Sequence, residues 1–462
     1  MAVCEISVDR CVFFLYLLKE QGKGMRKSMS EHFTNMRDLI SALAISLNLI
    51  NPDMQHHHEQ TAYLAFQIGQ EMGLRGEDLN NTVYAALLHD IGSVVSPVPQ
   101  KLEEIEAHRH EVAALGAHML EDLEGFSTVS HIIGINQNSY RENLRILGAK
   151  GCGETCVDIS QAIHLADVVT SLFVYNVPVL NQVKRIREAV ELGRETEFSP
   201  KALDAFQRCA EREYLWLDVA LNPSFLLLFT GTIHSVSLDE TVKLTRLMSR
   251  IIDYRSSFTA MHSAGVAASA RTLAQLVGMS GDDCKKMTIA GYLHDVGKLR
   301  VPNSILDKPG RLTDEEFNIV KEHPYYTRWI LMNIEGFEPI ADWAGFHHEK
   351  LNGKGYPFHL SAEDLDLGAR IMAVADIFSA ITEVRPYRDG MSREAAMAVM
   401  WSNAENGTLD PALVRLLEEH YEQIDAERER ESREAGSRYF RSLEMRKKEG
   451  LPSSSQARRI TA

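Results

Sequence analysis

The residues best suited to chemistry lie between His347 and Pro357, where two adjacent histidines precede a carboxylate and a glycine-rich turn. Neighbouring imidazoles on a helix point about 100° apart, so His347 and His348 cannot share one buried apolar face. They can instead bind two ions that lie side by side. Paired ions about 3.5–4 Å apart hold and activate a water in many enzymes that cleave phosphate esters. A histidine pair on a solvated helix is the alternative, so this stretch needs support from other parts of the chain.

Further candidate ligands lie on both sides of this stretch. Asp376 interrupts a run from Ile371 to Phe378 that is otherwise apolar. Because an unpartnered buried carboxylate is strongly destabilising, Asp376 needs a partner, and a metal ion is the leading candidate. The other candidates are a His-Asp dipeptide and two single histidines, namely His294-Asp295, His262 and His323.

Together these residues resemble the HD-GYP family of bacterial phosphodiesterases. The resemblance covers about residues 255–412 and rests on His262, His294-Asp295, Lys298, His323, His347-His348, Gly355-Tyr356-Pro357 and Asp376. It implies a metal-dependent enzyme that opens a cyclic dinucleotide to a linear one, with cyclic di-GMP as the default substrate. The leading alternative substrate is 3′,3′-cyclic GMP-AMP. The rival functions are a cyclic-dinucleotide sensor or scaffold that does not hydrolyse its ligand, and an HD hydrolase of mononucleotides or RNA.

The resemblance also implies how two divalent metal ions would be bound. One ion would take His262, His294, Asp295 and Asp376, and Asp295 would bridge to a second ion on His323, His347 and His348. Two cations that share a water lower its pKa towards neutrality. Some family members bind a third ion through a glutamate four residues before the first histidine. Phe258 stands there in this chain, so we expect two ions. His and Asp ligands alone do not separate iron, manganese, zinc and nickel.

The remaining motif residues are expected to act on the substrate. By resemblance, Lys298 would neutralise charge on the phosphate and help protonate the leaving ribose oxygen. Arg385 and Arg388 would bind phosphate, because guanidinium groups suit that task. Gly355-Tyr356-Pro357 would shape the substrate cleft. Glu349 is expected to orient a histidine rather than to bind a metal.

A second, eroded version of the same pattern lies nearer the N-terminus. His57 precedes His89-Asp90 by the same interval as His262 precedes His294-Asp295, and Asp167 corresponds to Asp376. Ser93 replaces Lys298, Asn136-Gln137 replaces His347-His348, His110 falls near the place of His323, and Gly-Tyr-Pro is missing. We therefore expect a structural or regulatory copy that packs on the active one. The alternative is a site in which His57, His89, Asp90 and Asp167 still bind one metal ion.

Helical periodicity dominates the chain. Apolar residues recur at spacings of three and four with almost no strand-like alternation, which predicts an all-α protein of tandem HD-domain bundles. Residues from 413 to about 448 carry charges on most faces, which favours a solvated helix partly free of the body, with a coiled-coil homodimer as the alternative. The expected segments are an N-terminal extension (1–30), a degenerate HD domain (31–180), a helical connector (181–253), a catalytic HD-GYP domain (254–412), and a charged helix with a disordered tail (413–462).

Composition limits the possible partners and compartments. The net charge of −15 argues against a general surface for nucleic-acid polymers. The six cysteines are scattered, which favours free thiols in a reducing cytoplasm. The apolar run at 11–18 is too short to cross a bilayer and lacks the basic flank of a signal peptide. We therefore expect a cytoplasmic protein that does not insert into a membrane.

Overall fold

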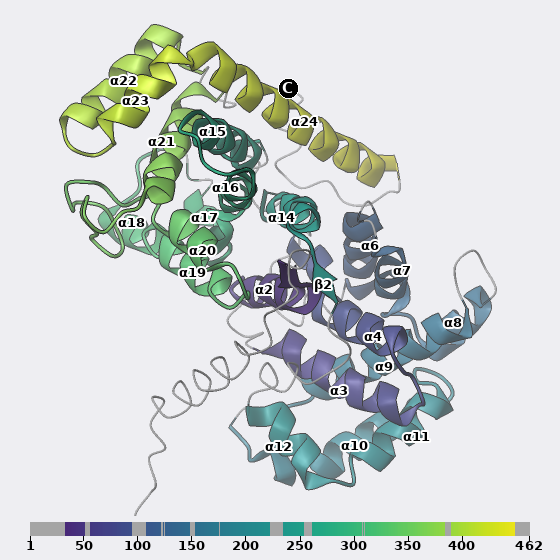
Figure 1. Cartoon of the computed structure of the whole chain (residues 1–462). Coiled ribbons are helices and arrows are strands. Elements are labelled where there is room, and N and C mark those ends of the chain that lie inside the picture. Colours follow the sequence, from purple (N-terminus) through teal and green to yellow (C-terminus); the bar gives the residue numbers. More distant parts are fainter. Residues whose placement is uncertain are drawn as a thin grey trace, which may run out of the picture.

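The computed structural model describes residues 33–50, 56–94, 108–121, 123, 125–147, 153–174, 176–221, 234–253, 261–306, 308, 310–383 and 390–448. Nearly all of their secondary structure is helical, so the predicted all-α class is confirmed (Figure 1). The exception is a small antiparallel sheet in which β1 (Thr34–Asn35) pairs with β2 (Ser235–Val236). The expected N-terminal extension, the disordered tail, Arg385 and Arg388 lie outside the described residues.

The first bundle is built around α3, which packs against α4 and α9, while α6 packs against α7. Its elements are α3 (His57–Glu71), α4 (Glu77–Leu87), η3 (Ile91–Val94), α6 (Arg109–Glu121), α7 (Ser127–Ile135), α8 (Tyr140–Ile146) and α9 (Glu154–Ser171). Four connecting elements follow: η4 (Val179–Asn181), α10 (Val183–Glu191), α11 (Pro200–Cys209) and α12 (Glu213–Leu221). They cover the first bundle, where the buried Trp216 ring packs edge-on against Phe206 and Phe173.

The second bundle repeats this arrangement around α15, which packs against α16, α21 and α24. Its elements are α14 (Leu238–Asp253), α15 (His262–Leu276), α16 (Gly281–Leu293), η5 (Val296–Arg300), α17 (Asn303–Leu306), α18 (Asp314–Val320), α19 (His323–Leu331), α20 (Glu338–Gly345), α21 (Leu367–Thr382), α22 (Arg393–Glu405), α23 (Pro411–Glu419) and α24 (Tyr421–Lys448). No helix among the described residues is long and apolar enough to cross a membrane.

Helix α2 (Met36–Asn48) lies between the two bundles. It packs against α4 of the first bundle and against η5 and α19 of the second (Figure 1). Asp38 on α2 accepts a hydrogen bond from the backbone N–H of Glu335 at 3.2 Å. The ring of Phe33, just before α2, lies 5.7 Å from the ring of Phe337. The expected packing of the two copies is therefore mediated in part by α2.

Two glycines show how the copies correspond. A Cβ atom on Gly92 would lie 2.0 Å from the carbonyl oxygen of Val112, and one on Gly297 would lie 2.0 Å from the carbonyl oxygen of His323. Glycine is thus needed at the same close helix contact in both bundles. Val112 therefore occupies the place of His323, and the sequence-based match of His323 with His110 is wrong by about half a turn of helix.

The charged C-terminal helix is not free of the body in its first half. Tyr421, Ile424, Arg428 and Ser432 are buried at helical spacing, and this face of α24 packs along α15 (Figure 1). The hydroxyl of Ser432 donates a hydrogen bond to the carbonyl oxygen of Met261 at 3.0 Å. The prediction of a solvated helix is wrong here because one buried residue per turn suffices for packing on the alanine-rich α15, even where that residue is polar or charged.

Candidate metal centre

All seven predicted metal ligands converge in the second bundle, and most stand at helix ends. His262 begins α15, His294 directly follows α16, Asp295 precedes η5, His323 begins α19, His347-His348 follow α20, and Asp376 lies within α21. Capping side chains that accept hydrogen bonds from backbone N–H groups help fix these elements. Ser280 caps the start of α16 through the N–H of Asp283 at 3.1 Å, and Asp366 caps α21 through the N–H of Ala369 at 2.8 Å.

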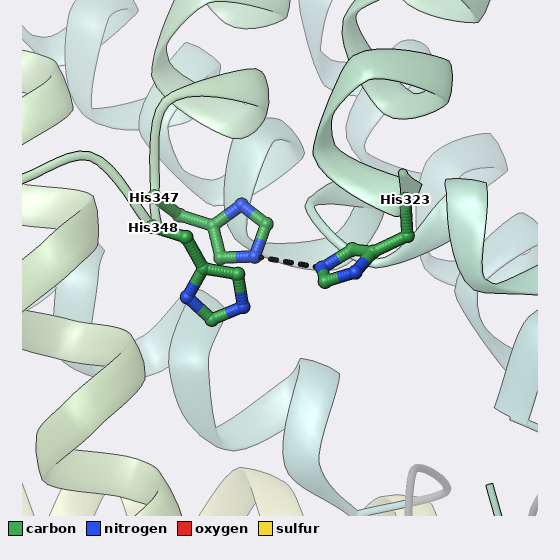
Figure 2. A group of neighbouring side chains, drawn as sticks. All are labelled: His323, His347 and His348. Atoms are coloured by element: carbon green, nitrogen blue, oxygen red, sulfur yellow. Dashed lines mark hydrogen bonds between the residues drawn. The ribbon is translucent and has the colours of Figure 1, made fainter. Parts of the chain in front are cut away.

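The ligand atoms form three overlapping groups, each with all its atoms within 4.8 Å of one another. They are His262, His294 and Asp376; His294, Asp295 and His347; and His323, His347 and His348. Figure 2 shows the rings of the third group, where the Nε2 atoms of His323 and His347 are 3.3 Å apart. His348 lies beside them, with its Nδ1 atom 3.7 Å from Oδ2 of Asp376.

Asp295 joins the histidines of the two expected ion sites. Its Oδ2 atom lies 3.3 Å from Nε2 of His294, and its Oδ1 atom lies 3.4 Å from Nε2 of His323 and 3.9 Å from Nε2 of His347. On the other side, Oδ1 of Asp376 lies 3.1 Å from Nε2 of His262. One carboxylate thus faces two sets of nitrogen ligands, which is the arrangement that a bridging ligand needs.

Hydrogen bonds to the backbone set the tautomer of three histidines. The Nδ1 atoms of His294, His323 and His347 lie 2.8, 2.6 and 2.6 Å from the carbonyl oxygens of Gly291, Val320 and Ala344, each three residues earlier. Because a carbonyl oxygen only accepts, each Nδ1 carries the proton and donates it. Each Nε2 then presents a lone pair to the centre, as in metal-binding histidines.

The polar atoms of the centre fit a metal ion. Within the described part of the chain, the buried Nε2 of His294 and Oδ1 of Asp295 have no hydrogen-bond partner. The two Nε2 lone pairs of His323 and His347 face each other, which is repulsive unless a cation or proton lies between them. Buried polar groups without partners are costly, and a divalent ion would satisfy all four side chains.

The surroundings of His323, His347 and Asp376 favour the protonation states that bind metals. Burial, with the nearby charge of Lys298, lowers the pKa of His323 to about 3, and burial beside His294 lowers that of His347 to about 4. Burial alone would raise the pKa of Asp376, but the hydrogen bond with His262 and the neighbouring His348 hold it well below its usual value. These groups are therefore neutral imidazoles and a carboxylate at pH 7.

Glu383 is a member of the centre that sequence analysis missed. This buried residue follows α21, and its Oε2 atom lies 3.4 Å from Nδ1 of His262. Burial alone would lower the pKa of His262, but the hydrogen bond with Asp376 and the nearby carboxylate of Glu383 raise it to about 10. A metal bound at His262 must therefore displace a proton. The only sequence signal was its position two helical turns beyond Asp376.

Lys298 and the Gly-Tyr-Pro turn border the ligands. The Nζ atom of Lys298 lies 2.6 Å from Oδ2 of Asp295, and the lysine side chain is 23 % exposed. The ring of Tyr356 lies 4.9 Å from the ring of His348 and 5.9 Å from that of Phe317. A Cβ atom on Gly355 would lie 2.4 Å from Cα of Glu349, so only glycine fits this close backbone contact.

Glu349 has a different role from the one expected. Its carboxylate accepts hydrogen bonds from the backbone N–H groups of Phe358 at 2.7 Å and Leu360 at 2.9 Å. The expectation that Glu349 orients a histidine is therefore wrong. It fixes the backbone after Pro357, because a buried carboxylate with two N–H donors is a strong local clamp.

The first bundle keeps part of this centre. Nε2 of His57 lies 3.1 Å from Oδ1 of Asp167, and Nε2 of His89 lies 3.2 Å from Oδ2 of Asp90. Gln137 donates a hydrogen bond to Oδ2 of Asp167 at 3.0 Å, where His348 faces Asp376 in the second bundle.

Comparison with known proteins defines the class. Residues 54–170 and residues 246–413 each match the family described as the HD domain. The chain therefore carries two HD domains, and HD domains are metal-dependent hydrolase domains.

The relatives of the chain are cyclic-dinucleotide phosphodiesterases. The chain is 27% identical over 437 residues to the "3'3'-cGAMP-specific phosphodiesterase 1" of Vibrio cholerae, covering 88% of this chain and 98% of the relative. It is 41% identical over 162 residues to "3'3'-cGAMP-specific phosphodiesterase 3" of the same organism, covering 35% of each chain. It is 40% identical over 159 residues to a "Cyclic di-GMP phosphodiesterase" of Pseudomonas aeruginosa, covering 34% of this chain and 38% of the relative. The chain is a homologue of these HD-GYP proteins.

A solved structure shares the fold along most of the chain. The crystal structure of a cyclic GMP-AMP-specific phosphodiesterase from V. cholerae matches with a TM-score of 0.58 and 22% sequence identity. The match covers 83% of this chain and 97% of the other. The tandem arrangement of helical bundles is therefore an established fold.

Proposed function

We propose that this protein is a metal-dependent phosphodiesterase that hydrolyses a cyclic dinucleotide, cyclic di-GMP or 3′,3′-cyclic GMP-AMP, to a linear dinucleotide. The observation that carries the proposal is the position of Asp295, whose two oxygens face separate sets of histidines at 3.3 and 3.4 Å. Named relatives with this activity support the same conclusion.

In this proposal the centre holds two divalent ions of the iron or manganese type. His262, His294, Asp295 and Asp376 would bind the first ion; Asp295, His323, His347 and His348 would bind the second. When bound, such ions lower the pKa of a water and neutralise charge on a phosphate. Glu383 would hold the ring of His262 through Nδ1, as carboxylates commonly do for metal-binding histidines.

Lys298 would be the catalytic acid. Its ammonium group pairs with Asp295 at 2.6 Å, which directs it to the ligands, and its partial exposure leaves it within reach of a substrate. It would neutralise charge on the phosphate oxygens and pass a proton from Nζ to the leaving ribose oxygen. In the first bundle Ser93 takes this place, which supports hydrolysis in the second bundle only.

The turn formed by Gly355, Tyr356 and Pro357 would bind the substrate. Tyr356 lies beside His348 and the exposed Phe317, and such aromatic rings can stack on a purine. Arg385 and Arg388, which follow Glu383 in the chain, would bind the phosphates. We would test 3′,3′-cyclic GMP-AMP first, because a relative named as cGAMP-specific aligns with 88% of this chain.

We keep the segment boundaries expected from the sequence as our proposal for how the chain is divided into functional parts. A cytoplasmic location fits a second-messenger substrate. A homodimer through the face of α24 that carries Ile424 and Arg428 is not part of the proposal, because α15 already covers that face.

The test is turnover of both cyclic dinucleotides by the full chain loaded with manganese or iron. We expect a linear dinucleotide from at least one of them and no turnover by the variant His294→Ala with Asp295→Ala. The matched control is Glu363→Gln, an exposed carboxylate on the loop after Pro357, which should retain activity. Tight binding of a cyclic dinucleotide by metal-loaded protein without hydrolysis would contradict the proposal and favour a sensor.

A further inference from the structure

We infer that the first HD domain binds a divalent metal ion of its own. One of the ligands is His58, at a position where the second domain has a serine, Ser263. The cluster consists of four buried residues, His57, His58, His89 and Asp90, and the partly buried Asp167. The inference concerns the first bundle alone and does not depend on catalysis in the second.

The first part of the cluster mirrors the catalytic centre. Nδ1 of His89 lies 2.7 Å from the carbonyl oxygen of Ala86, as His294 does with Gly291, so Nε2 of His89 presents its lone pair inwards. That Nε2 atom lies 3.2 Å from Asp90 and 3.5 Å from Asp167, and His57 lies 3.1 Å from Asp167.

His58 completes the cluster from an unexpected position. Both α3 and α15 begin with the first histidine of their motif, so the residue after it is His58 in one domain and Ser263 in the other. The ring of His58 lies 5.4 Å from that of His89, while His347 lies 4.9 Å from His294. His58 thus provides from α3 the imidazole that the second domain provides after α20.

His58 compensates for an imidazole that the first domain lacks just after α7. Phe126 before α7 and Phe337 before α20 occupy the same position, each after a glycine of positive φ. Counting from these residues places Asn136 where the second domain has His347. The first domain has therefore lost one imidazole beside its His-Asp pair and gained another.

The surroundings of His58 are those of a metal-binding histidine. Its Nδ1 atom lies 2.5 Å from Oδ1 of Asn48, and the Asn48 amide donates to Oε2 of Glu59 at 2.8 Å. Glu59 thereby fixes the Asn48 amide so that its oxygen accepts the Nδ1 proton. The Nε2 atom of His58 is then an unprotonated acceptor, and it is buried with no hydrogen-bond partner in the described chain. Such outer partners orient metal-binding histidines.

The cluster fits one ion rather than two. His57, His89 and Asp167 form one group of atoms within 4.8 Å of each other, and His58, His89 and Asp90 form another. Both groups need Nε2 of His89, which has a single lone pair and can bind one ion only. Three imidazoles with two carboxylates suit a divalent transition metal such as manganese, iron or zinc, and not calcium or magnesium.

The role of this ion is structural or regulatory. Val112 replaces His323 and Ser93 replaces Lys298, so a second ion and the proposed catalytic acid are both missing. Asn48 lies on α2, the helix between the bundles. An ion at His58 is therefore connected through Asn48 to the helix that packs on η5, which carries Lys298.

The test measures metal in protein whose catalytic centre has been disabled by His294→Ala, Asp295→Ala and His347→Ala. After loading with manganese and exhaustive dialysis, elemental analysis should find one ion per chain. Adding His58→Ser, the residue of the second domain, should remove that ion, while adding His56→Ser at the exposed neighbouring histidine should not. The readout is metal content and not activity, so failure of this inference can be told apart from failure of the proposed function.

Two results would overturn the inference: no bound metal in the disabled protein, or the same metal content with His58→Ser as with His56→Ser. If circular dichroism shows that His58→Ser does not fold, Asn48→Ala replaces it. This variant keeps the imidazole and removes its Nδ1 acceptor, and it should weaken manganese binding about 10-fold or more. An unchanged dissociation constant in Asn48→Ala would also contradict a ligand role for His58.

Discussion

Replacing Glu349 with glutamine tests how the loop after Gly355-Tyr356-Pro357 is fixed. The Glu349 carboxylate is buried and accepts two backbone N–H groups, from Phe358 and Leu360. In Glu349→Gln one oxygen becomes an amide NH₂, which confronts a backbone donor. A buried donor left without its acceptor costs about 1–3 kcal/mol, and the remaining hydrogen bond loses its charge assistance. We expect the free energy of unfolding to fall by about 2–3 kcal/mol in total.

The same substitution should affect the substrate more than the metal. Tyr356 and Pro357 directly precede the clamped backbone, so a loosened loop should raise KM for the cyclic dinucleotide several-fold while kcat changes less. Metal content should remain that of the wild type, because no oxygen of Glu349 is hydrogen-bonded to a ligand histidine. The measurements are urea unfolding, steady-state kinetics and elemental analysis, with Glu363→Gln as the exposed control. Unchanged stability and KM, or a loss of metal without a change in KM, would refute the clamp.

Three further substitutions separate the remaining roles. Lys298→Met should lower kcat about 10²–10⁴-fold, the usual contribution of a general acid, while metal content stays constant; an active variant would exclude Lys298 as the acid. Glu383→Gln should weaken manganese binding about 10-fold or more, because Glu383 contacts Nδ1 of His262; equal dissociation constants in a metal titration would contradict this. Gly297→Ala should destabilise the protein by about 1–3 kcal/mol and disturb His323, because its Cβ would lie 2.0 Å from the His323 carbonyl oxygen. Gly281→Ala, where a Cβ meets open space, is the control in thermal unfolding, and equal midpoints would refute the contact.

Sequence analysis could predict the convergence of the ligands because their pattern resembles that of HD-GYP phosphodiesterases, while His347-His348 and Asp376 also have chemical content of their own. Two adjacent histidines and an aspartate in an apolar run have few interpretations other than metal binding, and the repeated His-to-His-Asp interval predicted the second bundle. Helical class followed from periodicity alone. What these features share is that local spacing determines them.

The errors concern contacts between segments that are distant in the chain. The partners of Glu349 are backbone N–H groups, which have no residue-specific signal in a sequence. Glu383 meets His262 only because α21 lies beside α15. The burial of α24 depends on Gly265, which lets Ser432 approach α15, and a surface rich in charge concealed that face. In each case packing between elements determines the role of the residue.

The two HD domains separate the requirements of the fold from those of the chemistry. Gly92 and Gly297 make the same close contact with the following helix, yet the residue whose carbonyl they meet is Val112 in one domain and His323 in the other. The glycine is therefore required by packing, whatever side chain the partner residue carries. Because a ligand can be lost at this position without altering the contact, the first domain could lose the second-metal ligands and keep its bundle. Packing of the bundle does not explain why the first domain keeps five other polar side chains, namely His57, His58, His89, Asp90 and Asp167. The buried Val112 and Asn136, which stand where the second domain has His323 and His347, show that the bundle packs without ligand side chains at those positions.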